Sequence, residues 1–175
     1  TGEYLNTMLP KGPLLLPEYP HVLMRFWARK FAFAMDISKM FLQIKIDEED
    51  RDYIRFLWTD QNGITHHCRM NCLVFGAILS PFQAIFVVFH HAQAFENQFP
   101  SACAHVRDAL YMDDIASGED DLDKARRSVE ELIKLFNLAS MKTHKWVSNQ
   151  KKDLKEVTED WLSTDIIVKI LCQAW

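Results

Sequence analysis

The sequence predicts a mixed α+β fold, in which strands and helices share one hydrophobic core. Of its 175 residues, 49% are hydrophobic and 25% are charged, and there are only five glycines and six prolines. A chain of this kind buries roughly two thirds of the surface that its unfolded form exposes, so it needs no disulfide or bound metal to stabilise the fold. Short apolar runs that suit strands alternate with longer segments of helical periodicity, without an internal repeat or a linker.

The first residues are expected to lead into this core. Four prolines predict an extended or looping segment with little regular structure: Pro10, Pro13, Pro17 and Pro20. A short helix is predicted over residues 21–30, and one side of it would carry Val22, Leu23, Phe26 and Trp27.

Strand patterns follow. The apolar residues 31–35 fit a buried strand because the run is too short for a helix, and it ends abruptly in Asp36. Residues 41–46 predict a second extended segment, and the polar residues 47–52 predict a turn.

A β-hairpin is predicted next. Residues 53–59 alternate as a strand does, and the pair Asn62-Gly63 is typical of a tight hairpin turn. The return strand would cover residues 64–71.

Two longer helices are predicted. Ser80 followed by Pro81 indicates a helix start, and the segment to Phe95 has so few charges that a central, buried helix is expected. The acidic residues 119–121 open an amphipathic helix. Its apolar positions recur at helical spacing at Leu122, Ala125, Val129, Leu132, Ile133 and Phe136. Residues 166–171 predict a final strand.

Composition argues against several classes of protein. Polar residues, a glycine and a proline interrupt the nearly uncharged residues 70–95, so no membrane-spanning helix and no membrane partner are expected. The chain does not open with the basic and then apolar run of a signal peptide. A net charge of −4 gives no global attraction for nucleic acid, so a polyanion would need a local basic groove or bound cations.

The four cysteines are scattered without a C-x-x-C pair, which favours a reduced, intracellular protein. A zinc site can be drawn from His66, His67, Cys68 and Cys72. Neighbouring strand residues point to opposite faces and cannot converge on one ion, so we interpret these residues as parts of a strand.

Three carboxylates interrupt apolar sequence. Asp36 follows one strand, and Asp113 with Asp114 splits residues 109–117, which predicts a hairpin with both carboxylates at its tip. Buried charges need a partner, and no Lys or Arg lies within 109–117. Hard divalent cations would supply one, and two of them roughly 3.5–4 Å apart suit in-line phosphoryl displacement.

A chance pair of aspartates is the alternative. With 14 Asp residues, about one adjacent pair is expected at random. Asp120-Asp121 illustrates this alternative, since it stands where a helix N-cap belongs. The pattern alone leaves both interpretations open.

The motifs resemble those of a known family. Residues 111–114, Tyr-Met-Asp-Asp, resemble the Y-x-D-D signature of reverse transcriptases. Residues 36–44 resemble the first aspartate motif of the palm, and residues 73–76 with 80–81 resemble the nucleotide-facing turn and helix. More narrowly, the chain resembles the polymerase of Bel/Pao-type LTR retrotransposons. This rests on Leu5-Asn6, Gly12-Pro13, Arg55–Trp58, Val74–Gly76, Ser80–Phe82, His91-Ala92, Lys145-Trp146, Ser148-Asn149, Val168-Lys169, Leu171 and Trp175.

The resemblance implies a polymerase palm, an antiparallel sheet backed by helices, with partial fingers. Residues 1–30 would be lead-in and partial fingers, and residues 31–175 the palm core up to the start of the primer grip, without thumb and RNase H. The implied function is that of an RNA-directed DNA polymerase fragment of a retrotransposon Pol polyprotein. It would add dNTPs to a primer on an RNA or DNA template, inside the cell and in cytoplasmic virus-like particles.

The resemblance also assigns catalytic roles. Asp36 and Asp113 would be the main ligands of two Mg²⁺ or Mn²⁺ ions, with Asp114 in support. Lys145 would be a candidate to protonate the departing pyrophosphate, and an exposed lysine on a solvated face is the alternative.

Three further residues would meet the nucleotide. Phe41 would be the steric gate against a ribose 2′-hydroxyl, with a core aromatic as the alternative. Phe75 and Gly76 would lie against the nucleotide, the glycine because its missing side chain permits close approach. Where relatives carry Gly-Gly-Phe this chain has residues 139–141, Ala-Ser-Met, so a turn that needs positive φ is expected to be strained or rebuilt.

Two other functions stay open at this point. One is a catalytically inactive or domesticated remnant that serves as a binding or structural module. The other is a nucleotidyl cyclase or another palm-like two-metal enzyme, which leaves residues 75–76 and 80–82 unexplained.

Overall fold

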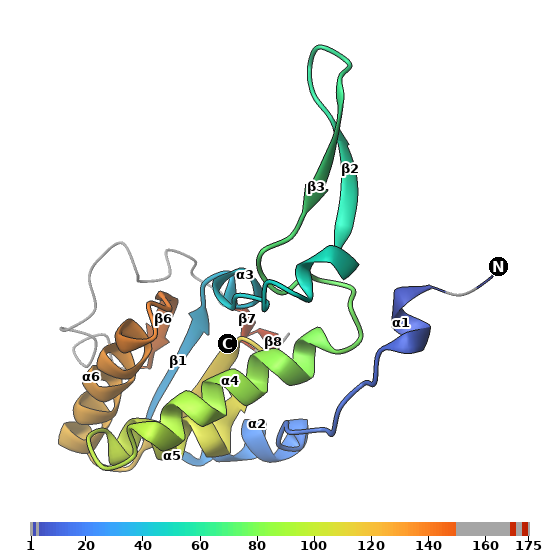
Figure 1. The fold of residues 1–175 in the computed structure, drawn as a ribbon. Coiled ribbons are helices and arrows are strands. Elements are labelled where there is room, and N and C mark those ends of the chain that lie inside the picture. Colours follow the sequence, from blue (N-terminus) through green and yellow to red (C-terminus); the bar gives the residue numbers. More distant parts are fainter. Residues whose placement is uncertain (1, 3, 150–168, 171–172, 175) are drawn as a thin grey trace. The chain divides into compact units, whose positions relative to one another are not determined.

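The computed structural model describes residues 2, 4–149, 169–170 and 173–174. They form two compact units, which we call the hairpin unit (Thr1–Leu14 with Lys39–Ala84) and the sheet unit (Leu15–Ser38 with Ile85–Trp175). Helices and antiparallel strands occur together, as the α+β prediction requires (Figure 1). None of the helices in the described part is long and apolar enough to cross a membrane.

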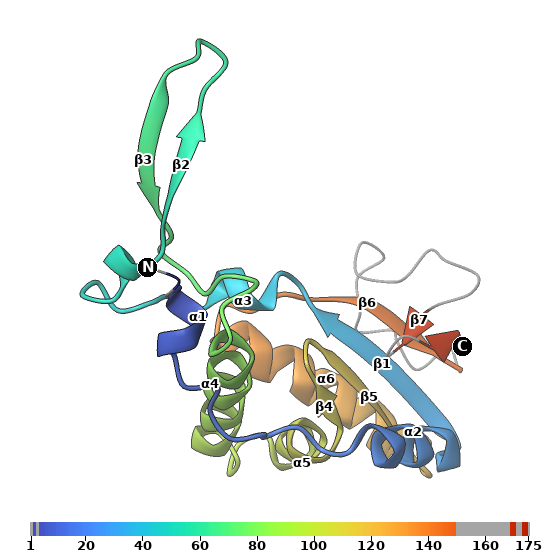
Figure 2. The same ribbon diagram turned by 90° about the vertical axis from the view of Figure 1, so that its right-hand side faces the viewer.

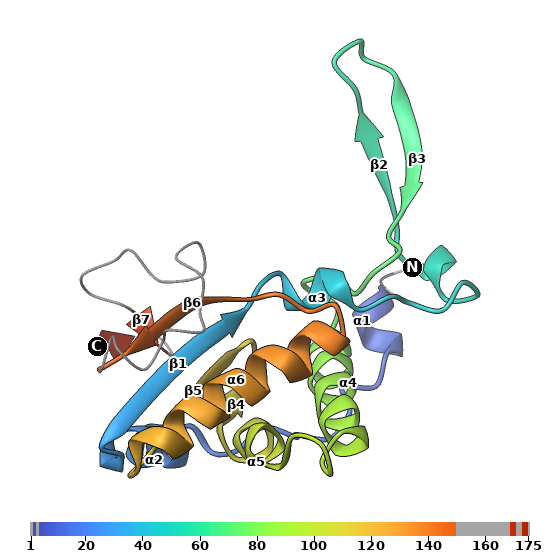
Figure 3. The ribbon, with the colours of Figure 1, turned by 90° about the vertical axis from the view of Figure 1, so that its left-hand side faces the viewer.

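A four-stranded antiparallel sheet forms the base of the sheet unit (Figure 3). Its order is β4-β5-β1-β6, with β1 (Phe31–Ile37), β4 (Leu110–Tyr111), β5 (Asp114–Glu119) and β6 (Thr143–Ser148). β1 has a neighbour on each side and is buried over residues 32–35. The predicted buried strand and the predicted hairpin at 109–117 are both confirmed.

Helices cover both faces of this sheet. α2 (Tyr19–Ala28) packs Val22 and Phe26 against a cluster of small residues, Ala32, Ala34 and Ala116. α5 (Pro100–Ala109) and α6 (Leu122–Leu138) cover the opposite face, where the His105 ring meets the Phe33 ring. Figure 1 shows α2 and α6 on opposite sides of β1, and Figure 2 views the same elements from the side of α2.

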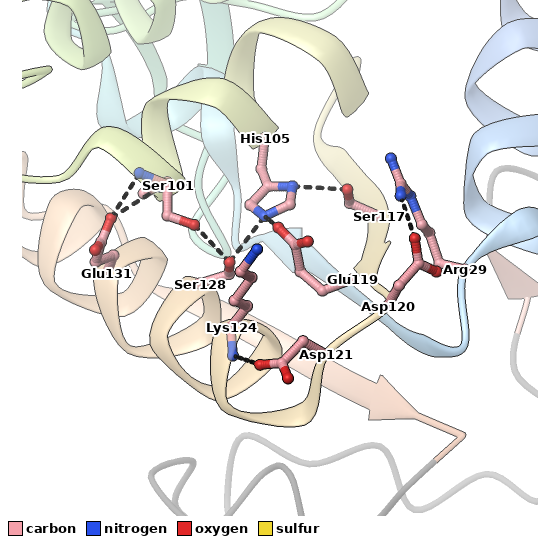
Figure 4. Close-up of polar contacts among 11 residues, drawn as sticks. Arg29, Ser101, His105, Ser117, Glu119, Asp120, Asp121, Lys124, Ser128 and Glu131 are labelled. Atoms are coloured by element: carbon pink, nitrogen blue, oxygen red, sulfur yellow. Dashed lines mark hydrogen bonds and ion pairs between the residues drawn. The ribbon is translucent and has the colours of Figure 1, made fainter.

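A buried polar network joins α5, β5 and α6 (Figure 4). His105 lies 2.7 Å from the Ser117 hydroxyl through Nδ1 and 2.9 Å from the Ser128 hydroxyl through Nε2. The Ser128 and Ser101 hydroxyls are 2.6 Å apart. Burial lowers the pKa of His105 to about 4, so the ring is neutral at pH 7 and donates from only one nitrogen. At least one serine must therefore donate to the ring.

The hairpin unit contains α1 (Leu5–Met8), α3 (Met40–Gln43), the 3₁₀ helix η1 (Arg51–Tyr53), β2 (Arg55–Thr59) and β3 (Thr65–Arg69). β2 and β3 form the predicted hairpin, and Gly63 in its turn has φ of 78°. Asp60 supports the turn by accepting hydrogen bonds from the backbone N–H groups of Asn62 and Ile64. His66 and His67, which were considered above as zinc ligands, occupy consecutive positions of β3, as the strand interpretation requires.

α4 (Ser80–Ala94) begins in the hairpin unit and continues into the sheet unit. Its predicted start at Ser80 is confirmed. The prediction that it is buried all round is wrong, since Ala84 and Val88 are buried but Phe86 and Val87 are exposed. A low charge does not by itself place a helix face inside, because apolar side chains also make up much of a protein surface.

Other local predictions need correction. Residues 41–46 form no strand: α3 and an isolated bridge from Lys45 to Cys72 occupy this region. A short apolar run does not distinguish helix from strand, and Lys39, with φ of 51°, turns the chain into α3. The helix predicted over 21–30 exists as α2, but Trp27 is exposed.

Two more helices, α1 and α5, were not predicted. α1 adds a single helical turn to the lead-in, and α5 begins at Pro100, a residue typical of a first helical position. Ser140 has φ of 56°, which confirms the strained turn expected there. Most of the strand predicted at 166–171 lies outside the described residues, although β7 (Lys169–Ile170) pairs with β8 (Gln173–Ala174).

Candidate active site

The strand register places two of the three predicted carboxylates opposite each other. β1 and β5 run antiparallel, and Asp36 pairs with Asp114. Directly opposite residues of an antiparallel pair have Cα atoms about 4.5–5.5 Å apart and project their side chains from the same face. Asp36 and Asp114 therefore share one face of the sheet.

Asp113 lies in the turn between β4 and β5. Its carbonyl accepts a hydrogen bond of 2.7 Å from the backbone N–H of Ile37, which ties the turn to the end of β1. Met112, just before it, has φ of 58°. A residue other than glycine rarely adopts this conformation, and such strain is concentrated at functional sites.

β6 contains a bulge at the level of Asp36. Ala34 pairs with Val147 and Asp36 with His144, so β6 has one extra residue between these pairs. Lys145, within the bulge, has φ of 51°, which breaks the usual alternation of side chains. Two consecutive residues therefore reach one carboxylate: Lys145 Nζ lies 3.0 Å from Asp36 Oδ2, and His144 Nδ1 lies 3.1 Å from Oδ1.

The ion pair keeps Lys145 charged. Its hydrogen bond with Asp36 raises the pKa of Lys145, and the charges of Asp36, Asp114 and Asp113 raise it further. The lysine side chain is 62% exposed, so solvent screens the interaction. Residues 109–117 contain no Lys or Arg to balance the charges of Asp113 and Asp114. Lys145, from β6, supplies a positive charge near them.

The residues predicted to face the nucleotide belong to the hairpin unit. The Phe41 ring is 4.8 Å from the Phe75 ring between centroids. Phe41 is 8% exposed and Phe75 is 71% exposed. Phe41 is thus a core aromatic in this structure, and its role as a steric gate stays a prediction.

Gly76 follows Phe75 in the same loop. It has φ of 92°, and no atom lies within 4 Å of the place that a Cβ would take. Glycine is needed here for its backbone conformation. Close approach to a nucleotide, the reason expected from the resemblance, stays a prediction.

A comparison with protein families identifies the chain. The family model described as "Reverse transcriptase (RNA-dependent DNA polymerase)" matches residues 5–154 of the chain. The chain belongs to the reverse transcriptase family. Reverse transcriptases are RNA-directed DNA polymerases and hence nucleotidyltransferases; they act on a nucleic acid template with a primer and on dNTPs, and generally use divalent ions such as Mg²⁺. A search of curated proteins finds no match.

The carboxylates of this reverse transcriptase suit a divalent ion in chemistry and register. Carboxylate oxygens are the ligands that Mg²⁺ and Mn²⁺ prefer, and Asp36 and Asp114 share a face. Within the described residues, no three His, Cys, Asp or Glu side chains are gathered around one point. Asp36 instead faces Lys145 and His144, so ion binding at Asp36 requires the Lys145 ammonium to withdraw.

His144 is the residue of this site that sequence analysis missed. Its neighbour Lys145 marks the right segment, but regular alternation would point the two side chains to opposite faces. Only the bulge brings both to Asp36.

Proposed function

We propose that this reverse transcriptase chain is the palm and partial fingers of the polymerase of a Bel/Pao-type LTR retrotransposon. It adds dNTPs to the 3′-hydroxyl of a primer on an RNA or DNA template. The observation that carries this proposal is the pairing of Asp36 with Asp114 beside the Asp113 turn. The Bel/Pao assignment rests on the sequence landmarks from Leu5-Asn6 to Trp175.

In this proposal, Asp36, Asp113 and Asp114 would hold two divalent ions, which would supply positive charge to the phosphoryl oxygens during transfer. Asp36 and Asp113 are the main ligands. Lys145, which already carries its proton, leaves Asp36 and donates that proton to the departing pyrophosphate. Phe75 and Gly76 hold the nucleotide, and Phe41 rejects a ribose.

The proposed context is a retroelement Pol polyprotein. Residues 1–30 are lead-in and partial fingers, residues 31–175 are the palm core, and thumb and RNase H regions of the same polyprotein complete the enzyme. Such a polymerase works in the cytoplasm, within virus-like particles.

Primer extension tests the catalytic assignment. The chain, extended at both ends in its reading frame, is assayed on poly(rA)/oligo(dT) with Mg²⁺. Asp113→Asn keeps the shape of the side chain but removes its charge, so we expect synthesis to fall at least about a hundredfold. Asp123→Asn, at an exposed carboxylate in the first turn of α6, is the matched control. Undiminished synthesis by Asp113→Asn would refute the assignment.

An inactive remnant that serves as a binding module is the second candidate. The ion pair of Lys145 with Asp36 favours it, because it leaves the carboxylate satisfied without a metal, and so does the strained Ser140. Calorimetric titration with Mn²⁺ discriminates the two. A working polymerase binds the ion and loses that binding in Asp36→Asn, whereas a remnant shows no binding that depends on Asp36.

A further inference from the structure

The side chain of Asn6 bridges two segments of the hairpin unit that are far apart in sequence. Its Nδ2 donates a hydrogen bond of 2.7 Å to the carbonyl of Gly76, and its Oδ1 accepts one of 2.9 Å from the backbone N–H of Ile78. A side-chain amide offers one donor group and one acceptor side by side, so it can satisfy two backbone groups at once. Asn6 therefore holds the Phe75–Gly76 loop directly.

The loop has few other backbone restraints. Leu73 N–H bonds to Ile44 before the loop, and Ser80 N–H bonds to Ala77 after it. Between these points, the carbonyl of Gly76 and the N–H of Ile78 have Asn6 as their hydrogen-bond partner. Asn6 thus satisfies backbone groups of the loop, as the backbone of a neighbouring strand does in a sheet.

Apolar packing alone does not fix the segment that carries Asn6. α1 has no buried residue. Leu5, Met8 and Leu9 line a cavity of about 310 Å³, which Leu73 and Val74 also line. Side chains that face a cavity lose contacts on that side, so the two hydrogen bonds of Asn6 set the position of α1 against the loop.

A second anchor follows six residues later. A Cβ at Gly12 would lie 2.5 Å from the ring of Phe82, and Gly12 has φ of 77°. Only glycine lets the backbone pass this ring at that distance. The segment from Asn6 to Gly12 is therefore fixed at both ends on the residues that follow Phe75.

We infer that Asn6 is a positioning residue of the polymerase, which holds the Phe75–Gly76 loop in the conformation that receives the dNTP. The inference rests on the proposed role of that loop in nucleotide binding. The inference gives the N-terminal segment a function: it positions the loop, and the loop binds the nucleotide.

Two readouts test the inference in Asn6→Ala. The first is hydrogen exchange of the Ile78 amide in the 175-residue chain. Loss of its acceptor should speed exchange about five- to tenfold. Thr7→Ala is the matched control, because Thr7 lies in the same helix and bonds to Tyr4. Asn6→Asp keeps an acceptor for Ile78, so its exchange should stay slow.

The second readout is the KM for dTTP in primer extension on poly(rA)/oligo(dT), by the chain extended at both ends. A misplaced loop weakens binding of the nucleotide, so KM should rise about tenfold while kcat changes little. A mere loss of folded enzyme would lower the apparent kcat and leave KM unchanged. Gly76→Ala, strained at φ of 92°, reports on the loop itself and should raise KM as well.

The outcomes separate the two claims. Unchanged exchange at Ile78 in Asn6→Ala overturns the inference, whatever the activity. Faster exchange with an unchanged KM also overturns it, provided that Gly76→Ala raises KM. If Gly76→Ala leaves KM unchanged, the proposed role of the loop in nucleotide binding fails, and the inference fails with it.

Discussion

Asp36 is the central residue of the candidate site. It pairs with Asp114 through the sheet, and its carboxylate faces an ammonium group 109 residues away in the sequence. The ion pair is partly exposed, and such pairs contribute roughly 0–1 kcal/mol to stability. The contact therefore matters for the charge of the site more than for folding.

Removal of the Lys145 charge should strengthen cation binding. In Lys145→Met, a divalent ion at Asp36 no longer competes with an ammonium group. A unit charge at about 4 Å is worth roughly 1 kcal/mol in water, so Mn²⁺ affinity should rise about fivefold. Calorimetry measures the affinity, and Lys145→Arg, which keeps the charge, is the control. Equal affinities in all three proteins would show that Lys145 does not compete for the site.

At the scale of elements, local signals explain several starts and turns. Asp121 lies at the N-cap of α6, where its Oδ1 accepts a hydrogen bond of 2.9 Å from the Lys124 N–H. Asp120 pairs with Arg29 instead. The second aspartate pair of the sequence therefore has structural roles, at a helix N-cap and in an ion pair.

Loss of this cap should destabilise the protein. Asp121→Ala leaves a backbone N–H of the first turn of α6 without its acceptor, which costs about 1 kcal/mol. Urea unfolding followed by circular dichroism measures the change. Asp121→Asn keeps an acceptor and should stay within a few tenths of a kcal/mol of the original. An equal loss in both variants would assign the effect to charge.

The turn of the hairpin depends on backbone conformation alone. Gly63 has φ of 78° and open space where a Cβ would lie, so Gly63→Ala introduces strain without a clash. The expected cost is about 1 kcal/mol, confined to the hairpin. Faster amide exchange over β2 and β3, with unchanged exchange in β1, would bear this out. Gly63→Asn should lose less, because asparagine tolerates this conformation better.

For the whole molecule, the buried network around His105 links pH to stability. Burial favours the neutral ring and lowers its pKa, whereas the charges of Asp108 and Glu131 favour the charged ring. The Glu119 carboxylate lies 3.3 Å from Nε2. Burial dominates, since the ring is held between α5, β5 and α6 with its pKa lowered to about 4. Protonation of His105 therefore opposes folding.

The stability of the protein should fall as the pH falls from 6.5 to about 4. In this window the unfolded chain takes up the proton of His105 before the folded chain does, so acid favours unfolding. The shift from 6.5 to about 4 corresponds to a loss of about 3 kcal/mol once both forms are protonated. Urea unfolding at several pH values measures it.

His105→Gln is the control for this titration, because glutamine keeps polar atoms for the serines but does not titrate. Its stability should depend less on pH across the same window. A parallel decline in both proteins would assign the acid sensitivity to the carboxylates.

The elements that have strong local causes could be predicted from the sequence. The apolar residues 31–35 make a buried strand, Asn62-Gly63 makes a hairpin turn, and Ser80-Pro81 starts a helix, because each depends on neighbours along the chain. The same holds for the fold class and for the family motif at 111–114. The prediction of an extended segment over residues 41–46 was wrong, because a short apolar run suits helix and strand equally well.

Which residues contact each other across the fold could not be predicted in this way. Strand register sets Asp36 opposite Asp114, and one extra residue in β6 turns both His144 and Lys145 toward Asp36. The contact of Asn6 with Gly76 likewise joins segments 70 residues apart. Such contacts depend on how whole elements pack, and a one-residue change of register would send each side chain to the other face.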